Sequence, residues 1–185
     1  SGCYGHNGAD DVVLDAVLAA KELNGTPVRL VWSREDELSW SPLAPGMVTK
    51  IDANLADNSM IESFDISIKS PPHVKRPSGE NGEYLLAAEH MSSPLNPPNP
   101  IDTPLDKGGA ADRNSMPLYD IPNIRIQKQI VYDLPWRTSA MRGLGAFVNV
   151  YAIETLMDDI ASMQEIDPIE FRLKHLSDPR IIELI

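Results

Sequence analysis

The stretch Arg137-Thr-Ser-Ala-Met-Arg-Gly-Leu-Gly-Ala-Phe147 places two arginines and two glycines directly before a long apolar-periodic segment. This pattern is typical of a loop that runs into a helix N-terminus. Such a junction offers unpaired backbone N–H groups and the positive end of a helix dipole, so it suits an anion such as a phosphate or an oxo ligand. The opening residues Ser1-Gly-Cys-Tyr-Gly-His-Asn-Gly-Ala-Asp-Asp11 repeat the pattern. Residues 137–145, the arginine loop, and residues 1–9, the opening loop, are therefore expected to share one site.

The composition is that of an ordinary globular protein and excludes several functions. A chain of 185 residues with 42% hydrophobic and 23% charged residues can bury one domain core, or one and a half small ones. A net charge of −11 without a basic stripe argues against nucleic-acid binding. Cys3 is the sole cysteine, so an internal disulfide or a cysteine-ligated iron–sulfur cluster cannot form within the chain. No apolar run reaches the ~18 to 20 residues that span a membrane, and no signal peptide is expected at Ser1.

The first part of the chain predicts a helix, a strand and a hairpin. Apolar residues recur at helical spacing from Val12 to Leu23, with Asp10 or Asp11 as the cap and Asn24-Gly25 as the stop. The run Pro27–Trp32 predicts a short buried strand that, with this helix, would form a piece of an α/β layer. Ser33-Arg-Glu-Asp36 resembles a capping box. Two alternating segments, from Thr49 to Leu55 and from Phe64 to Ile68, predict a half-exposed hairpin.

The middle and last parts differ in character. Ten of the sixteen prolines lie between Pro71 and Pro122, which predicts a long ordered excursion with a short helix from Glu83 to His90. Residues 124–133 predict a further strand. The helix after the arginine loop should bury a stripe from Val150 to Ile160, and Asp167-Pro and Asp178-Pro should each begin a helix. The sequence thus predicts an α+β (mixed α/β) fold of helices on a mixed sheet, in three parts: residues 1–70, the proline-rich insert 71–123, and residues 124–185.

Several motifs resemble those of one enzyme family. The segment Thr138–Ala146 is similar to the arginine-and-glycine loop of the xanthine dehydrogenase and aldehyde oxidoreductase family, in its molybdopterin-binding large subunit. The opening Cys-Tyr-Gly-His-Asn-Gly-Ala-Asp-Asp resembles that of the isoquinoline 1-oxidoreductase and nicotinate dehydrogenase type. Other matching stretches are Pro27–Glu37, Asp112–Asp120 and Asp167–Leu176. Because these large subunits are much longer, the chain is expected to be an internal fragment.

The resemblance implies an activity and its cofactors. Such enzymes hydroxylate an aldehyde or N-heteroaromatic substrate with water as the oxygen source. The implied cofactors are molybdenum-molybdopterin, in the cytosine dinucleotide form, and iron–sulfur clusters on a partner chain. The implied partners are a small-molecule substrate, the iron–sulfur small subunit and the remainder of the large subunit, which would carry the general-base glutamate. The fragment alone is expected to be inactive, and the compartment stays open between cytoplasm and periplasm.

The resemblance also points to site residues. Arg142 matches a position at which an arginine faces the substrate pocket, although an arginine beside glycines is on its own more often a surface charge. The xanthine enzymes have Phe-Gly-Gly-Lys where this chain has Tyr4-Gly-His-Asn7, which argues against xanthine as the substrate. His6 can bond a cofactor oxygen or, equally well, nearby backbone. The expected cofactor-facing residues are Cys3, Tyr4, Gly5, His6, Met141, Gly143, Gly145 and Ala146.

Two functions other than molybdenum-dependent hydroxylation are also compatible with the sequence. One is a non-catalytic binding or scaffolding module of the same architecture. The other is a nucleotide-binding enzyme, but Gly2, Gly5 and Gly8 have the spacing G-x-x-G-x-x-G rather than the dinucleotide fingerprint, and no strand of the chain precedes them. Cys3 has no identifiable partner base, which favours a packing role over a nucleophilic one.

Overall fold

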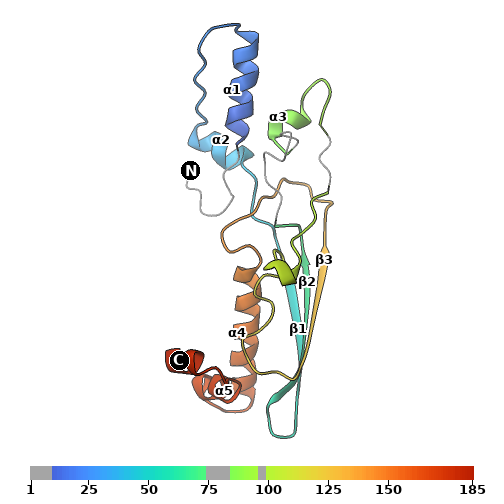
Figure 1. Ribbon diagram of the computed structural model, residues 1–185, viewed down its shortest axis with the longest axis vertical. Helices are drawn as coiled ribbons and strands as arrows, with labels where there is room; N and C mark the ends of the chain where they lie inside the picture. Colours follow the sequence, from blue (N-terminus) through green and yellow to red (C-terminus); the bar gives the residue numbers. More distant parts are fainter. Residues whose placement is uncertain (1–9, 74–83, 96–98) are drawn as a thin grey trace. The chain divides into compact units, whose positions relative to one another are not determined.

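The computed structural model describes residues 10–73, 84–95 and 99–185 (Figure 1). The chain divides into two compact units, each assembled from separate stretches of sequence. Unit 1 comprises residues 1–46, 71–102 and 131–144, and unit 2 comprises residues 47–70, 103–130 and 145–185. The proline-rich segment contributes to both units, and the arginine loop reaches unit 2 at Gly145.

Unit 2 contains a three-stranded mixed sheet in the order β1-β2-β3. Strand β1 (Val48–Leu55) pairs antiparallel with β2 (Ile61–Ser70), and β2 pairs parallel with β3 (Asn123–Ile130). Ile66 lies in register with Ile51 and with Ile126, so the three strands present apolar side chains on the same face. The predicted hairpin, the third strand and the α+β class are confirmed.

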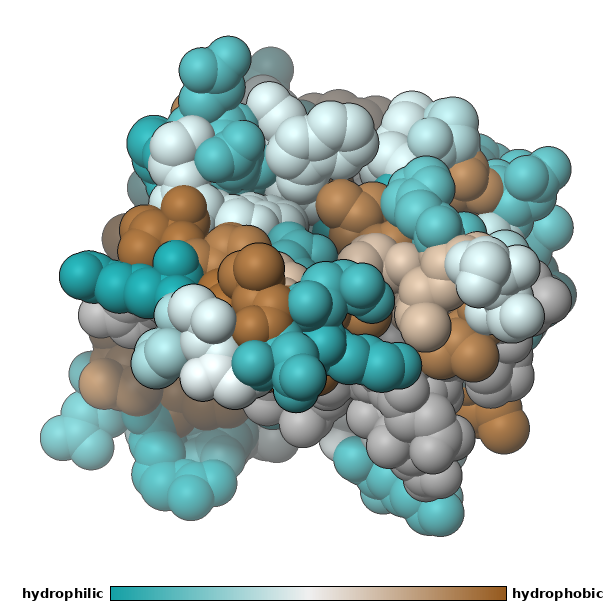
Figure 2. Space-filling view, turned by 90° about the horizontal axis from the view of Figure 1, so that it is seen from above, coloured by the Kyte–Doolittle hydropathy of each residue, from teal (hydrophilic) through white to brown (hydrophobic). Residues whose placement is uncertain are grey.

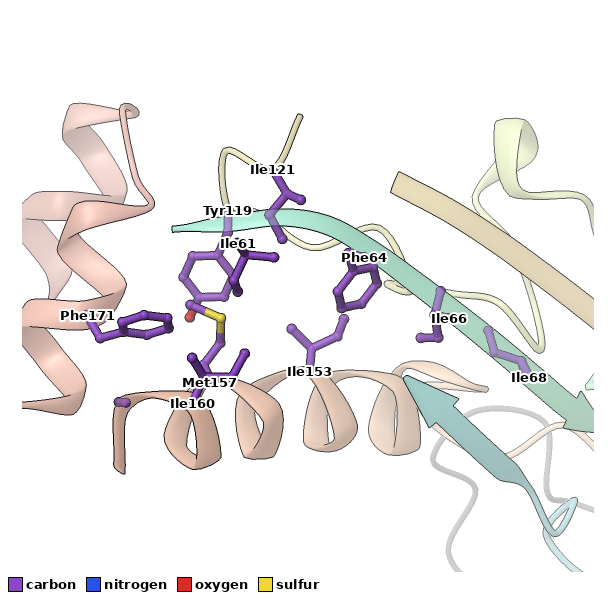
Figure 3. Close-up of a cluster of buried hydrophobic side chains, with 11 residues drawn as sticks. Ile61, Phe64, Ile66, Ile68, Tyr119, Ile121, Ile153, Met157, Ile160 and Phe171 are labelled. Carbon is purple, nitrogen blue, oxygen red and sulfur yellow. The ribbon is translucent and has the colours of Figure 1, made fainter. Parts of the chain in front are cut away.

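The core of unit 2 lies between the sheet and helix α4 (Ala146–Met163), which runs alongside it (Figure 1). Figure 3 shows side chains of β2 and α4 pointing toward one another. Positions three and four apart on a helix share a face, and Ile153, Met157 and Ile160 are accordingly buried together. The predicted stripe is thus confirmed for these three positions, whereas Val150 is 40% exposed. The cluster comprises Ile61, Phe64, Ile66, Ile68, Tyr119, Ile121, Ile153, Met157, Ile160, Ala161 and Phe171.

The remaining helices of unit 2 begin where their local sequence predicts. Helix α5 (Pro168–Lys174) begins after Asp167, whose carboxylate accepts the N–H groups of the next two non-proline residues. Helix α6 (Pro179–Leu184) follows Asp178 in the same way. Proline at the first helical position lacks the N–H that a helix start leaves unpaired, so both junctions are favourable. A single 3₁₀ turn, η1 (Leu105–Lys107), completes the unit.

Unit 1 contains three helices in its described residues: α1 (Asp11–Glu22), α2 (Arg34–Trp40) and α3 (Leu86–Glu89). The capping box of α2 is present, since Ser33 Oγ accepts the Asp36 N–H and Asp36 accepts the Ser33 N–H. Helix α1 ends at Glu22, and Asn24 and Gly25, the predicted stop, follow it with positive φ angles. The predicted aspartate cap of α1 is wrong, because Asp10 makes no side-chain cap bond and the carboxylate of Asp11 is used elsewhere.

The predicted buried strand from Pro27 to Trp32 is also wrong. These residues run without strand pairing to the described chain, and Val31 is 71% exposed. A strand needs a neighbour to satisfy its N–H and C=O groups, and the described residues of unit 1 supply none to this segment. Trp32 is held instead by its indole N–H, which donates to Asp15 at 3.0 Å. The predicted helix-on-sheet layer is therefore absent from the described part of unit 1.

Large apolar side chains remain exposed in both units. Figure 2 shows apolar surface between hydrophilic residues on one face of the molecule. Helix α1 buries only Asp11, while Val13 and Val17 on its apolar face are more than half exposed. Among the helices of the described residues, none combines the length and the apolar character needed to cross a bilayer.

Candidate functional site

The first half of the arginine loop is anchored in unit 1. Leu43 N–H donates to the Arg137 carbonyl at 3.0 Å, and Ser139 N–H donates to the Leu43 carbonyl at 3.0 Å. Thr138, Ser139 and Ala140 are buried. This short parallel bridge fixes the backbone that leads into the second half of the loop.

The second half of the loop is an exposed turn. Arg142 and Gly143 are exposed, and the Leu144 N–H donates to the Met141 carbonyl at 3.1 Å. Gly143 has a φ of +85°, and a Cβ added there would meet no atom within 4 Å. Leu144 also has a positive φ, +54°. A left-handed non-glycine residue costs about 1–3 kcal/mol, and such strain concentrates at functional sites.

Arg137 joins four segments of unit 1 through its guanidinium. Its two terminal nitrogens bind both carboxylate oxygens of Asp11, at 3.1 and 2.8 Å. They also donate to the carbonyls of Trp40, at 2.7 Å, and Tyr84, at 3.2 Å. The Asp11 carboxylate, which is fully buried, additionally accepts the Leu86 N–H at 2.7 Å. Sequence reasoning missed this pair, since its members lie 126 residues apart and no local signal links them.

Gly145 begins unit 2 at the N-cap of α4 and packs against residues 110–111. Its N–H donates to the Ala110 carbonyl at 2.9 Å, and a Cβ on Gly145 would lie 2.0 Å from the Ala111 carbonyl oxygen. Only glycine permits so close an approach. Asn149, one turn into α4, is buried and donates to the carbonyls of Ala111 and Arg113 at 2.9 and 3.0 Å. The segment 110–113 is thereby tied to the first turn of α4.

An ion pair between a partly buried lysine and a buried aspartate also holds this segment. Lys128 Nζ lies 2.9 Å from the Asp112 carboxylate and donates to the Thr103 carbonyl at 3.1 Å. Asp112 also accepts the Ala110 N–H at 3.2 Å. The segment against the start of α4 is therefore held by backbone, amide and charged contacts, and sequence reasoning had assigned it no such role.

The N-terminus of α4 suits an anionic group. Its N-cap residue, Gly145, supplies no side-chain cap, and the amides of a first helical turn have no partner within the helix. These N–H groups and the helix dipole favour a phosphate or another anion. Within unit 1, the open space over Gly143 likewise admits a close approach to backbone. Each of these two features, taken by itself, fits an anionic group that is held through main-chain atoms.

The structure brings together some of the predicted site residues. Met141, Arg142 and Gly143 form one turn of unit 1, whereas Gly145 and Ala146 begin α4 in unit 2. The predicted residues of the opening loop, Cys3, Tyr4, Gly5 and His6, lie outside the described residues. Among the residues that are described, no group of three His, Cys, Asp or Glu side chains is placed to hold a metal ion.

A cavity of about 270 Å³ lies beside the anchored half of the loop, within unit 1. Arg137 and Thr138 contribute to its wall together with aromatic and proline side chains. The exposed turn 141–144 does not line it. The cavity is thus separate from the residues that the sequence predicts to face a cofactor.

The amino-acid sequence of this region is similar to that of known proteins. Residues 109–176 match the model of the molybdopterin cofactor-binding domain, a range that includes the segment 110–113, the arginine loop and α4. A nicotinate dehydrogenase subunit of Pseudomonas putida is 35% identical over 185 residues, all of this chain and 14% of that protein. The beta subunit of isoquinoline 1-oxidoreductase from Brevundimonas diminuta is 27% identical over 180 residues, 95% of this chain and 20% of that protein.

The chain therefore spans 14% and 20% of the lengths of these two relatives. The matched range begins at Gly109, one residue before the segment tied to α4, and it continues through the end of α5 to Leu176. The sequence motifs predicted the same type of subunit. On these findings residues 109–176 resemble the molybdopterin cofactor-binding domain, and the chain as a whole is similar to part of the nicotinate dehydrogenase and isoquinoline 1-oxidoreductase subunits.

Proposed function

We propose that this chain is the part of a molybdenum hydroxylase large subunit that presents the arginine loop and the opening loop to the molybdopterin cofactor. The observation that carries the proposal is the arginine loop itself. It lies inside the range that matches the cofactor-binding domain, and it contains an exposed turn with an arginine and a left-handed glycine. An anchored base and an exposed, glycine-bearing tip are what a loop needs to bring backbone amides close to a ligand.

The proposed reaction is the hydroxylation of an aldehyde or N-heteroaromatic substrate, with water as the oxygen source. The names of both relatives refer to a nitrogen heteroaromatic compound, which supports the second substrate class. The cofactor, when bound, supplies the metal centre at which the substrate carbon is oxidised. The chain's own residues would bind the cofactor and orient the substrate.

Arg142 is the proposed catalytic residue. Its guanidinium would orient an anionic or carbonyl-bearing substrate and stabilise negative charge that develops on a heteroaromatic ring. Met141 and Gly143 flank it in the same turn, and Gly143 has no side chain to cover its main chain. Gly145 and Ala146 would act through the start of α4. In the opening loop, His6 would hydrogen-bond a cofactor oxygen or a substrate nitrogen beside Cys3, Tyr4 and Gly5.

The proposal includes further components outside this chain. Both relatives are named as subunits, which supports partner chains. With Cys3 as its sole cysteine, this chain cannot hold an iron–sulfur cluster by cysteine ligation, so the clusters are proposed to lie on a small subunit. The pterin is proposed to be in its cytosine dinucleotide form. The residues of this chain alone are expected to show no turnover with any electron acceptor, because the general base is proposed to lie in the remainder of the large subunit.

The test is an Arg142→Ala substitution in the assembled enzyme. Turnover of nicotinate and of isoquinoline should fall by about 100-fold or more, as for other single charge-stabilising groups, while molybdenum content stays at the level of the unchanged enzyme. The matched control is Arg180→Ala, which removes an exposed arginine of α6 that pairs only with the neighbouring Asp178 among the described contacts. It should alter neither value.

Unchanged turnover in the Arg142→Ala enzyme would remove Arg142 from the mechanism. A large subunit that holds molybdopterin tightly but turns over no aldehyde or heteroaromatic compound would instead support a non-catalytic binding module of this architecture.

A further inference from the structure

We propose that the ion pair between Asp11 and Arg137 is a positioning clamp for the arginine loop. Arg137 is the first residue of the arginine loop, and Asp11 is the first residue of α1. The inference rests on the proposed function, because it assigns the pair to the retention of the cofactor. Neither residue is expected to touch the cofactor or the substrate.

The contacts converge on one guanidinium from segments that are distant in sequence. Asp11 binds it through both carboxylate oxygens, and the carbonyls of Trp40 and Tyr84 accept its remaining bonds. The end of α2 and the start of α1 are thereby fixed to the first residue of the arginine loop. Leu86 N–H, at the start of α3, binds the same carboxylate and adds a further segment.

Arg137 is held by its main chain as well as its side chain. Its carbonyl accepts the Leu43 N–H, three residues beyond the Trp40 carbonyl that binds its guanidinium. Both attachments therefore fix Arg137 to residues 40–43. The turn at Met141–Leu144 follows directly after the buried residues 138–140. A displacement of Arg137 would therefore also displace this turn.

The chemistry of the pair favours a positioning role over a purely stabilising one. A buried ion pair pays a large desolvation cost, and apolar residues of similar volume often stabilise a fold equally well. What an arginine adds is geometry, since its planar fork directs several hydrogen bonds at once. A lysine can restore the charge but not the four directed bonds to Asp11, Trp40 and Tyr84.

The decisive variant replaces the pair by apolar residues, Asp11→Leu with Arg137→Met, in the assembled holoenzyme. Arg137→Lys is the milder second variant. The control is Glu154→Leu with Arg172→Met, which removes a pair of unit 2 whose arginine is as buried as Arg137 and whose carboxylate is more exposed than that of Asp11. Three quantities are measured for each: the melting temperature, the rate at which molybdenum and pterin are lost on dialysis, and hydrogen exchange of the amides of residues 141–144.

If the clamp positions the loop, cofactor loss accelerates by about 10- to 100-fold in the apolar variant and measurably in Arg137→Lys, as for other outer-shell partners, at temperatures far below melting. Loop amides should exchange faster in both, and the control should match the unchanged enzyme. Equal rates of cofactor loss and of loop exchange in clamp variants and control would overturn the proposal, whatever happens to the melting temperature.

If the apolar variant does not fold, Arg137→Lys decides alone. If the unchanged enzyme carries no molybdopterin, the proposed function fails first, and that outcome is visible without any variant.

Discussion

His175 accepts the main-chain N–H of Ile61 through its Nε2 atom at 3.0 Å, across 114 residues of sequence. Its other ring nitrogen, Nδ1, lies 2.9 Å from the Phe171 carbonyl. An N–H group can only donate and a carbonyl can only accept, so the ring is neutral with its proton on Nδ1. The side chain is fully buried and joins the end of α5 to the first residue of β2.

Removing this ring should destabilise the protein strongly. We expect His175→Ala to lower the free energy of unfolding by about 2–4 kcal/mol, because it opens a cavity and leaves the buried Ile61 N–H without an acceptor. The measurement is urea unfolding of the intact protein. His90→Ala, at an exposed histidine after α3, is the control and should change stability by less than about 0.5 kcal/mol. Equal losses in the two variants would contradict the structural role.

Glycine at position 145 should be required by packing. In Gly145→Ala the new Cβ would lie 2.0 to 2.8 Å from main-chain atoms of Ala110 and Ala111, which cannot move aside as a side-chain tip can. We expect a loss of about 3 kcal/mol or more, at the upper end of overpacking effects. Gly46→Ala is the control, because a Cβ there meets no atom within 4 Å, and it should be neutral or slightly stabilising. Thermal unfolding of both variants tests this, and a mild effect at Gly145 would refute the close approach.

Stability at high pH should depend on Tyr119. Burial, and then the charge of Glu154, raise the pKa of Tyr119 to about 12 from an ordinary value of 10.0. The folded state thus favours the neutral phenol. Its contribution is fully present below about pH 10 and is lost as the pH rises through about 12. The free energy of unfolding should therefore fall between these values.

The Tyr119→Phe variant isolates this contribution. It lacks the hydrogen bond from the phenol to Glu154 and should be less stable at neutral pH. Between about pH 10 and 12 its stability should decline less steeply than that of the unchanged protein, since one titrating group is gone. Tyr151→Phe, at a tyrosine that is 70% exposed, should leave the slope as it was. Parallel curves for the Tyr119→Phe variant and the unchanged protein would mean that Tyr119 does not titrate in this window.

The elements that the sequence predicted correctly are those with local signals. The capping box of Ser33 and Asp36 and the caps at Asp167 and Asp178 depend on residues two or three positions apart, which a pattern can reveal. Alternation likewise identified the hairpin, because each strand has one face on the core. The run Pro27–Trp32 failed because its β-branched and apolar composition says nothing about whether a partner strand is present.

The residues of the candidate site divide in the same way, into those with a local sequence signal and those whose role depends on contacts with distant segments. Motif resemblance pointed to Met141–Gly143, which form one turn with a left-handed glycine, and their role toward a cofactor stays a prediction. It did not find Asp11, which looked like a helix cap and instead binds Arg137. Nor did it find the use of Gly145 against the Ala110 and Ala111 backbone. Both depend on contacts between distant segments, which no spacing in one sequence specifies.

Gly143 and Gly25 form a matched pair that separates backbone strain from function. Their φ angles are +85° and +86°, and at both positions a Cβ would meet no atom within 4 Å. Alanine at either position should therefore cost a similar amount, about 1–2 kcal/mol, from the left-handed conformation alone. Thermal unfolding measures this part and should give nearly equal shifts.

The two variants should differ in cofactor retention. Under the proposed function, a methyl group on Gly143 occupies the open space through which the cofactor approaches the turn, whereas Gly25 lies in the turn that follows α1. In the assembled enzyme, Gly143→Ala should lower molybdenum and pterin content per subunit several-fold, and Gly25→Ala should not. Because the two substitutions impose the same backbone penalty, a difference in cofactor content cannot arise from stability. Equal cofactor content in the two variants would show that the cofactor does not approach the main chain at Gly143, and the site would then have to be sought elsewhere in the matched range.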